Sequence, residues 1–374
     1  MSHYGFAIVG AGIAGASAGY NLAGAGATLL IERESQPGYH STGRSAALYT
    51  ETYGNRVIRA LTFASRPFFE APPAGFTEHP LLRPRGTLVI ARADQRAKLG
   101  EAFAESKAIL PSVEAVDAAR AQTLCPALRP GYVDSGFFEE DARDMDVHAI
   151  HQGFLRGFRA AGGTLACDAE VTRLARNGAG WVIETRAGTF TADVVINAAG
   201  AWADALARMA GARPVGLVPK RRTACTIEPP AESGFRAWPA VIDVDEQFYW
   251  KPDAGQLILS PADETPVEPQ DIQPEEMDIA ICVDRVEQAS TLAIRRVMRK
   301  WAGLRSFVKD KTPVAGFAPE APGFFWLAGQ GGYGIMTSPA MGRVAAALAQ
   351  RKPVPADIAA YGVSAADLAP QRLA

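Results

Sequence analysis

The 374-residue chain has the composition of a folded, nearly neutral protein. Its 38 lysines and arginines against 40 aspartates and glutamates give a formal net charge of −2, and 48% of its residues are hydrophobic. This balance excludes a disordered chain and disfavours a dedicated nucleic-acid binder, which is usually strongly basic. The length favours about two domains or one large interleaved unit.

The four cysteines form no metal-ligand or redox motif, because they stand far apart at Cys125, Cys167, Cys225 and Cys282. We therefore expect no metal site and a reducing compartment. No run of about 18 apolar residues predicts a transmembrane helix. The glycine-broken start lacks the basic segment of a signal peptide, so we expect a cytoplasmic protein, with peripheral contact to an inner membrane left open.

Strand and helix signals alternate at the amino terminus. Residues 4–9 predict a buried strand, residues 10–15 open a helix, and residues 27–31 predict a second strand that ends at Glu32. These elements form a compact βαβ unit. The loop that follows, residues 33–45, is rich in Gly, Ser, Pro and Thr and is unusually long for a plain connection.

The run Gly10-Ala11-Gly12-Ile13-Ala14-Gly15 has the GxGxxG spacing of a dinucleotide-binding turn. The first glycine allows a tight turn, the second lets a pyrophosphate approach the backbone, and the third lets helix and strand pack closely. The helix N-terminus offers unpaired N–H groups to the phosphates. Glu32 would accept hydrogen bonds from ribose hydroxyls, which favours FAD or NAD over NADP.

Two later strands also run into glycine-rich turns, at residues 197–200 and 329–334. The remaining elements predicted in chain order are a helix over 147–161, strands over 164–166, 170–174, 181–185 and 194–196, strand-rich segments over 217–227 and 240–259, a helix over 274–296, a strand over 324–327 and a helix over 335–350. An NAD domain uses one glycine turn, whereas an extended FAD crosses several strand ends, so the pattern favours FAD. The last turn would place a helix N-terminus near the flavin ring, where its dipole stabilises negative charge.

These turns resemble those of the D-amino-acid oxidase superfamily of flavoproteins. The resemblance rests on residues 10–15, 32–33, 41–45, 197–202 and 331–334. A narrower similarity, to the bacterial FAD-dependent D-arginine dehydrogenase, rests on residues 36–47, 219–222, 248–249, 301–305 and 370–373. The resemblance covers essentially the whole chain.

The resemblance implies an α/β fold in which two domains share the polypeptide. A Rossmann-like FAD-binding domain would take residues 1–80, 145–210 and 306–374, and an α+β substrate-binding domain with a mainly antiparallel sheet would take residues 81–144 and 211–305. FAD would bind non-covalently, since no His or Cys stands at a motif position connected to the ring. The expected FAD contacts are Gly10, Gly12, Ile13, Ala14, Gly15, Glu32, Arg33, Ser41, Thr42, Gly43, Arg44, Ser45, Ala46, Val171, Ala199, Gly200, Trp202, Gly331, Gly332, Tyr333, Gly334 and Ile335.

The activity implied by the resemblance is that of a D-amino-acid dehydrogenase. The substrate would lose hydride from Cα to flavin N5, and the imino acid would hydrolyse to a 2-oxo acid and ammonia. Arg222 and Arg305 would clamp the substrate carboxylate, with hydroxyl hydrogen bonds from Tyr53 and Tyr249. Arginine suits this role as a planar, permanently charged partner. Read without the resemblance, the basic run at 220–222 is also typical of a solvated surface.

Two departures from the D-arginine dehydrogenase pattern bear on the substrate. Leu48 stands where that pattern has histidine, and Thr87 where it has the glutamate that pairs with a cationic side chain. A buried cation would lose its partner there. We therefore expect neutral, mainly apolar D-amino acids, with Glu51 as a candidate replacement acid.

Gly332 and Tyr333 complete the expected substrate contacts. Residues 46–54 would act as a lid over the site. The expected electron acceptor is a quinone or another carrier, with O2 left open.

Two other functions stay open. One is an oxidase that acts on glycine, sarcosine or another secondary amine and uses O2. The other is a noncatalytic flavin-binding subunit, although the presence of both arginines and both tyrosines speaks against it. Chirality also stays open, because an L-selective or cyclic-imino-acid enzyme could use the same arginine clamp.

Overall fold

The computed structural model describes residues 2–178, 180–231 and 234–373. The described strands of the first sheet are, in chain order, β1 (His3–Val9), β2 (Thr28–Ile31), β9 (Thr164–Ala166), β10 (Val171–Asn177), β11 (Gly180–Thr185), β12 (Gly188–Asn197), β19 (Val314–Phe317) and β20 (Phe324–Ala328). Strands β9, β2, β1, β12 and β20 are parallel neighbours in that order. Strand β19 adds an antiparallel edge, and β10 and β11 continue from the first half of β12. This is the Rossmann-like sheet that the sequence predicted.

Both faces of this sheet are covered. Strands β2 and β20 are buried along their whole length, which explains why they read as continuous apolar runs. In β1, alternate residues enter different cores: Ile8 joins the cluster on one face, and Ala7 and Val9 join the cluster on the other. The period of two along a strand produces this division.

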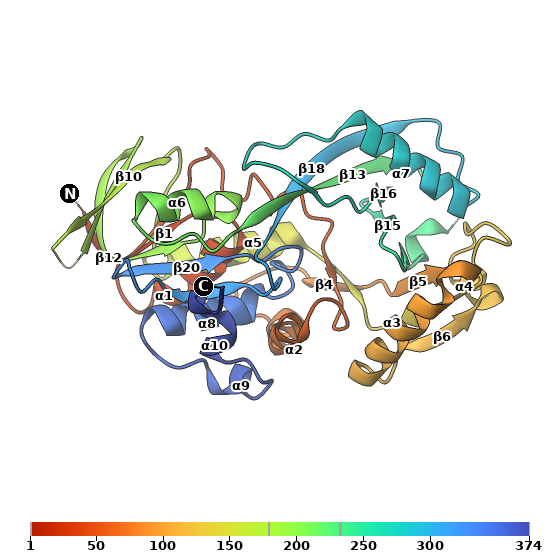
Figure 1. Ribbon diagram of the computed structural model, residues 1–374, viewed down its shortest axis with the longest axis horizontal. Helices are drawn as coiled ribbons and strands as arrows, with labels where there is room; N and C mark the ends of the chain where they lie inside the picture. The colour runs from red at the N-terminus through yellow and green to blue at the C-terminus, as the bar shows by residue number, and fades with distance from the viewer. Residues whose placement is uncertain (1, 179, 232–233, 374) are drawn as a thin grey trace.

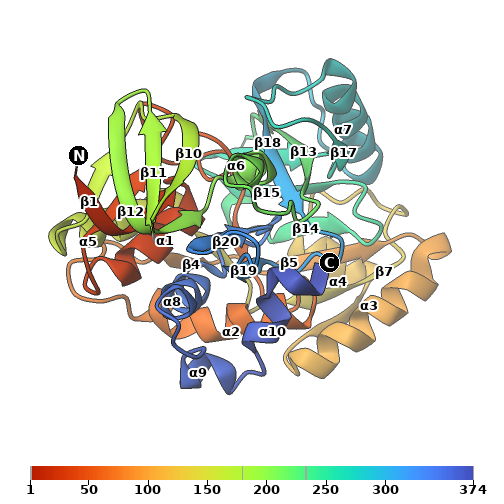
Figure 2. The same ribbon diagram turned by 60° about the vertical axis from the view of Figure 1, so that its left-hand side comes forward.

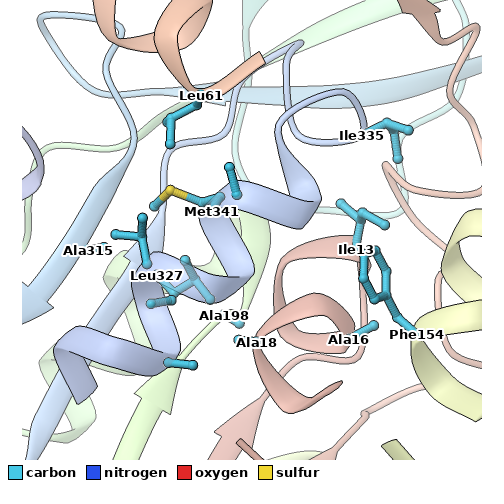
Figure 3. Close-up of a cluster of buried hydrophobic side chains, with 14 of the residues drawn as sticks. Ile13, Ala16, Ala18, Leu61, Phe154, Ala198, Ala315, Leu327, Ile335 and Met341 are labelled. Carbon is cyan, nitrogen blue, oxygen red and sulfur yellow. The ribbon is translucent and has the colours of Figure 1, made fainter. Parts of the chain in front are cut away.

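Helices cover the two lobes of the molecule. They are α1 (Ile13–Leu22), α2 (Arg56–Glu70), α3 (Arg96–Ile109), α4 (Ala118–Leu124), α5 (Val147–Ala160), α6 (Ala203–Met209), α7 (Glu276–Ala289), α8 (Ser338–Ala349), α9 (Ala356–Ala359) and α10 (Ala365–Leu368). Figure 3 shows the packing beneath the first sheet: Ile13 and Ala16 of α1 face Phe154 of α5, and Met341 of α8 lies between Leu61 and Ala315. None of the helices in the described part of the chain is long and apolar enough to cross a membrane.

The second sheet is built from two separate stretches of the chain. Its described strands are β5 (Thr87–Ala91), β6 (Glu114–Asp117), β7 (Ser135–Glu139), β13 (Val218–Ile227), β14 (Ala240–Asp243), β15 (Tyr249–Asp253), β16 (Gln256–Ser260), β17 (Thr265–Pro266) and β18 (Val297–Phe307). Every pair of neighbours is antiparallel except β5 and β14. A small sheet of β3 (Leu48–Tyr49), β8 (Arg143–Met145) and β4 (Leu82–Pro84) lies between the lobes. Figures 1 and 2 show β13 and β18 extending from the second lobe towards the first.

The predicted fold class is confirmed, with two corrections to element bounds. The helix predicted over 335–350 begins at Ser338 rather than at residue 335, because Pro339 fits only the first turn of a helix and the residues before it form successive turns. The helix predicted over 274–296 is shorter, since α7 spans Glu276–Ala289 and Pro274 lies before its N-cap. The predicted domain boundaries stay a prediction.

Two helical glycines provide a test of the packing between α1 and α8. A Cβ on Gly342 would lie 2.7 Å from the carbonyl oxygen of Ser17, whereas a Cβ on Gly100 in α3 would meet nothing within 4 Å. We expect Gly342→Ala to lower the free energy of unfolding by about 1–3 kcal/mol through overpacking. Gly100→Ala should raise it by about 0.5–1 kcal/mol, since alanine is the better helix former. Thermal unfolding of both variants measures the difference, and equal Tm values would contradict the close contact.

Candidate active site

The carboxyl ends of the parallel strands meet along one crevice of the first sheet. Strand β1 continues into Gly10, β2 into Glu32, β12 into the 198–200 turn and β20 into the glycine run at 329–334. Ligands of open α/β sheets bind outside such strand ends. The three glycine-rich turns that the sequence singled out therefore lie along one edge.

The N-terminus of α1 is shaped for an anion. Its N-cap is Gly12, which has no side chain to cap the helix, so the first-turn N–H groups that no protein side chain takes can bind phosphate. Gly10 has φ +103°, and a Cβ there would lie 2.3 Å from the Ala198 carbonyl oxygen. A Cβ on Gly15 would lie 1.9 Å from the Gly10 carbonyl oxygen. Gly10 and Gly15 thus allow the turn to pack closely, and Gly12 leaves room for a ligand.

Three side chains fix this turn from outside. The Glu32 carboxylate accepts a hydrogen bond from the Ala11 N–H at 2.9 Å, and the Thr42 hydroxyl accepts one from the Ile13 N–H at 3.0 Å. His151 on α5 lies 2.8 Å from the Ala11 carbonyl oxygen through Nε2. Burial lowers the pKa of His151, so the neutral ring donates this bond. Nothing in the sequence placed His151 at this turn, because its contact is made across the fold.

The first cavity beside this turn has a volume of about 190 Å³. Glu32, Arg33, Val171 and Trp202 line it, and the Arg33 guanidinium carbon lies 4.9 Å from the centre of the Trp202 ring. A carboxylate beside an aromatic wall suits a ribose and its adjoining base.

A second cavity of about 140 Å³ continues from the first. Gly12 and Thr42 line both cavities, and so does Gly200, which follows the neighbouring parallel strand β12. From there the second cavity reaches Arg222, Tyr249 and Arg305 and the turn at 331–334. The two cavities therefore form one long path that passes the N-terminus of α1, as an extended dinucleotide requires.

The third cavity, of about 400 Å³, opens from the far end of this path. This volume lies within the range of about 300–1,000 Å³ that is typical of small-molecule sites. Its apolar lining is contributed by Leu48, Val89, Phe137, Ile242, Val244, Phe248, Ile335 and Met336. Arg222, Tyr249, Arg305 and Gly332 line both the second and third cavities, so they stand at the junction.

The two arginines at the junction carry more positive charge than the surrounding protein balances. Arg222 is buried and has one carboxylate partner, Glu264, at 3.2 Å. Among the described residues no carboxylate lies within ion-pair distance of Arg305, whose side chain donates to the Tyr53 hydroxyl at 3.4 Å. Burial and the neighbouring Arg305 charge lower the pKa of Arg222. An anion bound between the guanidinium groups would counter both effects, because it favours the charged form of Arg222.

Tyrosine hydroxyls surround this arginine pair. Burial acts to lower the pKa of Arg305, but the hydroxyls of Tyr53 and Tyr249 outweigh it and raise that pKa. The Tyr333 ring centre lies 4.9 Å from that of Tyr53, and burial raises the pKa of the Tyr333 hydroxyl. Tyr333 therefore stays protonated as a hydrogen-bond donor at neutral pH.

The basic run on β13 is buried rather than solvated. Arg221 points to the opposite face from Arg222 and pairs with Asp278 at 2.9 Å. Lys220 shares the face of Arg222 and binds the other oxygen of Glu264 at 2.7 Å. Glu264, which the sequence did not single out, thus bridges the two cations.

The structure brings most of the predicted substrate contacts to the third cavity and leaves one out. Leu48, Tyr53, Thr87 and Tyr333 line it. Glu51 does not: its carboxylate accepts a hydrogen bond from the Tyr49 hydroxyl at 2.8 Å in the protein interior and pairs with Arg66. Glu51 as a replacement acid is therefore wrong, because the alternation of side chains along residues 48–52 turns it away from the cavity.

Among the described residues, the acids that do line the cavity are Glu105, Asp243, Glu246 and, on β7, Glu139. Glu139 pairs across the sheet with Thr87 of β5. A carboxylate therefore lies on the strand beside Thr87, the residue that replaces the glutamate of the D-arginine dehydrogenase pattern. The Glu139 oxygens accept hydrogen bonds from Thr50 and Thr52. The segment predicted as a lid is thus tied to the second sheet, and β3 within it pairs with β8.

A model of the FAD dependent oxidoreductase family, DAO, matches residues 6–348. The chain belongs to this family. A glycine oxidase from Geobacillus kaustophilus is 24% identical over 97% of this chain and 98% of its own length. An N-methyl-L-tryptophan oxidase from Salmonella enteritidis is 25% identical over 99% of this chain and 98% of its own.

Among solved structures, an L-alpha-glycerophosphate oxidase from Mycoplasma pneumoniae with FAD bound superposes with a TM-score of 0.83. It is 18% identical and the match covers 94% of this chain and 95% of that one, which shows a shared fold. The superfamily resemblance is thus confirmed, and FAD is the cofactor of this DAO-family protein.

Nearly all the expected FAD contacts of this DAO-family chain line the connected cavities. Two do not: Gly15 is enclosed behind Gly10, and Gly43 closes a turn through its N–H to the Gly38 carbonyl oxygen at 2.8 Å. No cysteine or histidine among the described residues lines the second cavity. The individual FAD contacts stay a prediction.

Glu32 offers a test of the FAD path. We expect Glu32→Gln to raise the Kd for FAD about tenfold or more, because a hydrogen bond to a charged group contributes about 1.5–3 kcal/mol. Glu34→Gln is the matched control, since Glu34 makes the same charge change nearby without lining the cavities. Titration of the apoprotein with FAD, followed by fluorescence, measures both. Equal Kd values for the two variants would exclude Glu32 from the site.

Proposed function

We propose that this protein is an FAD-dependent D-amino-acid dehydrogenase that prefers neutral side chains. One observation carries the proposal: Arg222 and Arg305, with the hydroxyls of Tyr53 and Tyr249, stand where the flavin path opens into the 400 Å³ cavity. A carboxylate is the anion that fits two guanidinium forks. The D configuration rests on the residues that resemble those of D-arginine dehydrogenase, and the relatives reported above do not bear on it.

The chain's own groups would bind and orient the substrate. Arg222 and Arg305 hold the carboxylate, and Tyr53 and Tyr249 donate hydroxyl hydrogen bonds beside it. Fixing the carboxylate at the junction aims Cα towards the flavin path, so orientation supplies much of the rate enhancement. The same positive charge disfavours a protonated amine, and the substrate can therefore react as the neutral amine without a strong base.

FAD, when bound, supplies the hydride acceptor. The substrate loses hydride from Cα and a proton from nitrogen, and water then hydrolyses the imino acid to a 2-oxo acid and ammonia. An external electron acceptor, for which we propose a quinone or another carrier, would complete the turnover.

The preference for neutral side chains is supported by the cavity wall beyond the clamp. Val89, Phe137 and Ile242 supply apolar surface there. The Thr87 hydroxyl is buried without a hydrogen-bond partner among the described residues, so it can serve a neutral polar group.

Of the four acids in the described part of the chain that line this cavity, three are already engaged by the protein. Glu139 accepts hydrogen bonds from residues 50–52, Glu105 pairs with Arg59 at 2.8 Å, and Asp243 accepts the Asp245 N–H at 3.0 Å. The fourth, Glu246, is exposed to solvent.

A glycine- or sarcosine-type oxidase that uses O2 is the second candidate. The printed names of the curated relatives favour it, since they include a glycine oxidase and an N-methyl-L-tryptophan oxidase. The cavity of about 400 Å³ favours a larger substrate than glycine. The clamp disfavours a noncatalytic subunit, because an empty arginine pair would cost stability.

Anaerobic flavin reduction across matched D- and L-amino acids tests the proposal. We expect D-leucine, D-methionine and D-phenylalanine to bleach the flavin faster than their L-enantiomers, than D-arginine and than glycine or sarcosine. In air, dye reduction should exceed peroxide release. Faster reduction by glycine or sarcosine, with stoichiometric peroxide, would establish the second candidate instead.

Arg305 provides a direct test of the clamp. We expect Arg305→Lys to raise KM about 10- to 100-fold, because lysine cannot make the paired hydrogen bonds of the guanidinium fork. Arg299→Lys is the matched control, since Arg299 is exposed on the same strand. An unchanged KM in Arg305→Lys with amino-acid substrates would exclude the clamp.

A further inference from the structure

Glu139 is a buried acid that the proposed reaction leaves without a role. It ends strand β7, is only 2% exposed, and lines the substrate cavity. Among the described residues no lysine, arginine or histidine lies within ion-pair distance of its carboxylate. An ionised group in such a place needs strong hydrogen bonds to be tolerated.

All the hydrogen-bond donors to this carboxylate come from one short segment. The Thr52 hydroxyl donates at 2.7 Å and the Thr50 hydroxyl at 2.9 Å, both to Oε2. The Glu51 N–H donates to Oε1 at 3.3 Å. Burial raises the pKa of Glu139, and these donors act against that shift. The carboxylate therefore joins residues 50–52 to a strand of the second sheet.

The next residue of the same segment belongs to the clamp. Tyr53 accepts the 3.4 Å hydrogen bond from Arg305, and its ring lies against Tyr333. Gly54 follows with φ +87°, and a Cβ there would lie 2.7 Å from the Ile58 side chain. The chain thus turns sharply directly after Tyr53. The position of Tyr53 depends on where residues 50–52 are held.

Other parts of residues 46–54 have attachments of their own. The Tyr49 hydroxyl lies 3.2 Å from the Thr62 carbonyl oxygen of α2, and the Glu51 carboxylate pairs with Arg66 of the same helix. The Lys251 ammonium donates to the Ala47 carbonyl oxygen at 3.3 Å, and Arg59 donates to the Thr52 carbonyl oxygen at 3.0 Å. The β3–β8 pairing spans only Leu48 and Tyr49. Glu139 supplies the buried, multiple attachment closest to Tyr53.

We propose that Glu139 is a positioning residue that anchors residues 50–52 to β7 and thereby holds Tyr53 against Arg305. This inference rests on the proposed carboxylate clamp. Glu139 acts on substrate affinity through Tyr53 and does not contact the reacting atoms. Its effect should therefore be the same for substrates with neutral and with cationic side chains.

Removing either the Glu139 carboxylate or the threonine hydroxyls that donate to it tests the proposal. We expect Glu139→Gln and the double variant Thr50→Val/Thr52→Val each to raise KM about tenfold, with kcat changed less than about threefold. Combining all three changes should be no worse than either alone, because both remove one interaction. Thr50→Ser/Thr52→Ser keeps the hydroxyls and should restore the KM of the unchanged enzyme.

Hydrogen–deuterium exchange of the FAD-bound enzyme gives a readout that needs no substrate. Amides of residues 46–54 should exchange faster in Glu139→Gln and in the valine variant, and at the unchanged rate in the serine variant. Unchanged exchange in Glu139→Gln would overturn the proposal. So would a KM effect confined to D-arginine and D-lysine, which would make Glu139 a side-chain recognition group.

The two proposals fail in different ways. If no amino acid reduces the flavin but exchange responds as expected, the anchor stands and the proposed function fails. If amino acids reduce the flavin normally while the valine variant keeps its KM, the function stands and the anchor fails.

Discussion

The proposed active site depends on two guanidinium groups, which the register of one sheet brings together with too little negative charge between them. Strand β13 pairs with β18 so that Lys220 lies opposite Arg305, which places Arg222 and Arg305 as diagonal neighbours on one face. The negative charge of Glu264 compensates the positive charge of Lys220 and part of that of Arg222. Tyrosine hydroxyls meet part of the remaining charge, and in the proposed clamp an anionic substrate group would complete the balance.

This sheet reaches the flavin path through a direct contact. The Gly331 N–H donates to the Ser306 carbonyl oxygen at 3.0 Å, directly after Arg305 in the chain. A Cβ on Gly332 would lie 2.9 Å from the Arg305 guanidinium, so only glycine lets the turn lie flat against the clamp. Helix α8 starts later than its sequence indicated, and successive turns rather than a helix N-terminus face the cavity. The two lobes therefore form one site.

Local spacing was enough to predict the nucleotide part of the site. The strand, the three glycines and Glu32 lie within one βαβ unit, so their geometry follows from neighbouring residues. The substrate part depends on long-range pairing. Glu139 meets residues 50–52 only because β7 pairs with β5, and His151 reaches Ala11 only because α5 packs on α1. The alternation of residues 48–52 did carry a usable signal, since Leu48, Thr50 and Thr52 line the cavity and Glu51 does not.

The most direct measurement compares an amino acid with the amine that lacks only its carboxylate. Under anaerobic conditions, D-phenylalanine and 2-phenylethylamine present the same ring and the same amine to the flavin. A carboxylate clamp at Arg222 and Arg305 predicts rapid flavin bleaching by D-phenylalanine and reduction by the amine that is slower by at least about a hundredfold, from two lost charged hydrogen bonds. Equal rates for the two compounds would contradict the clamp.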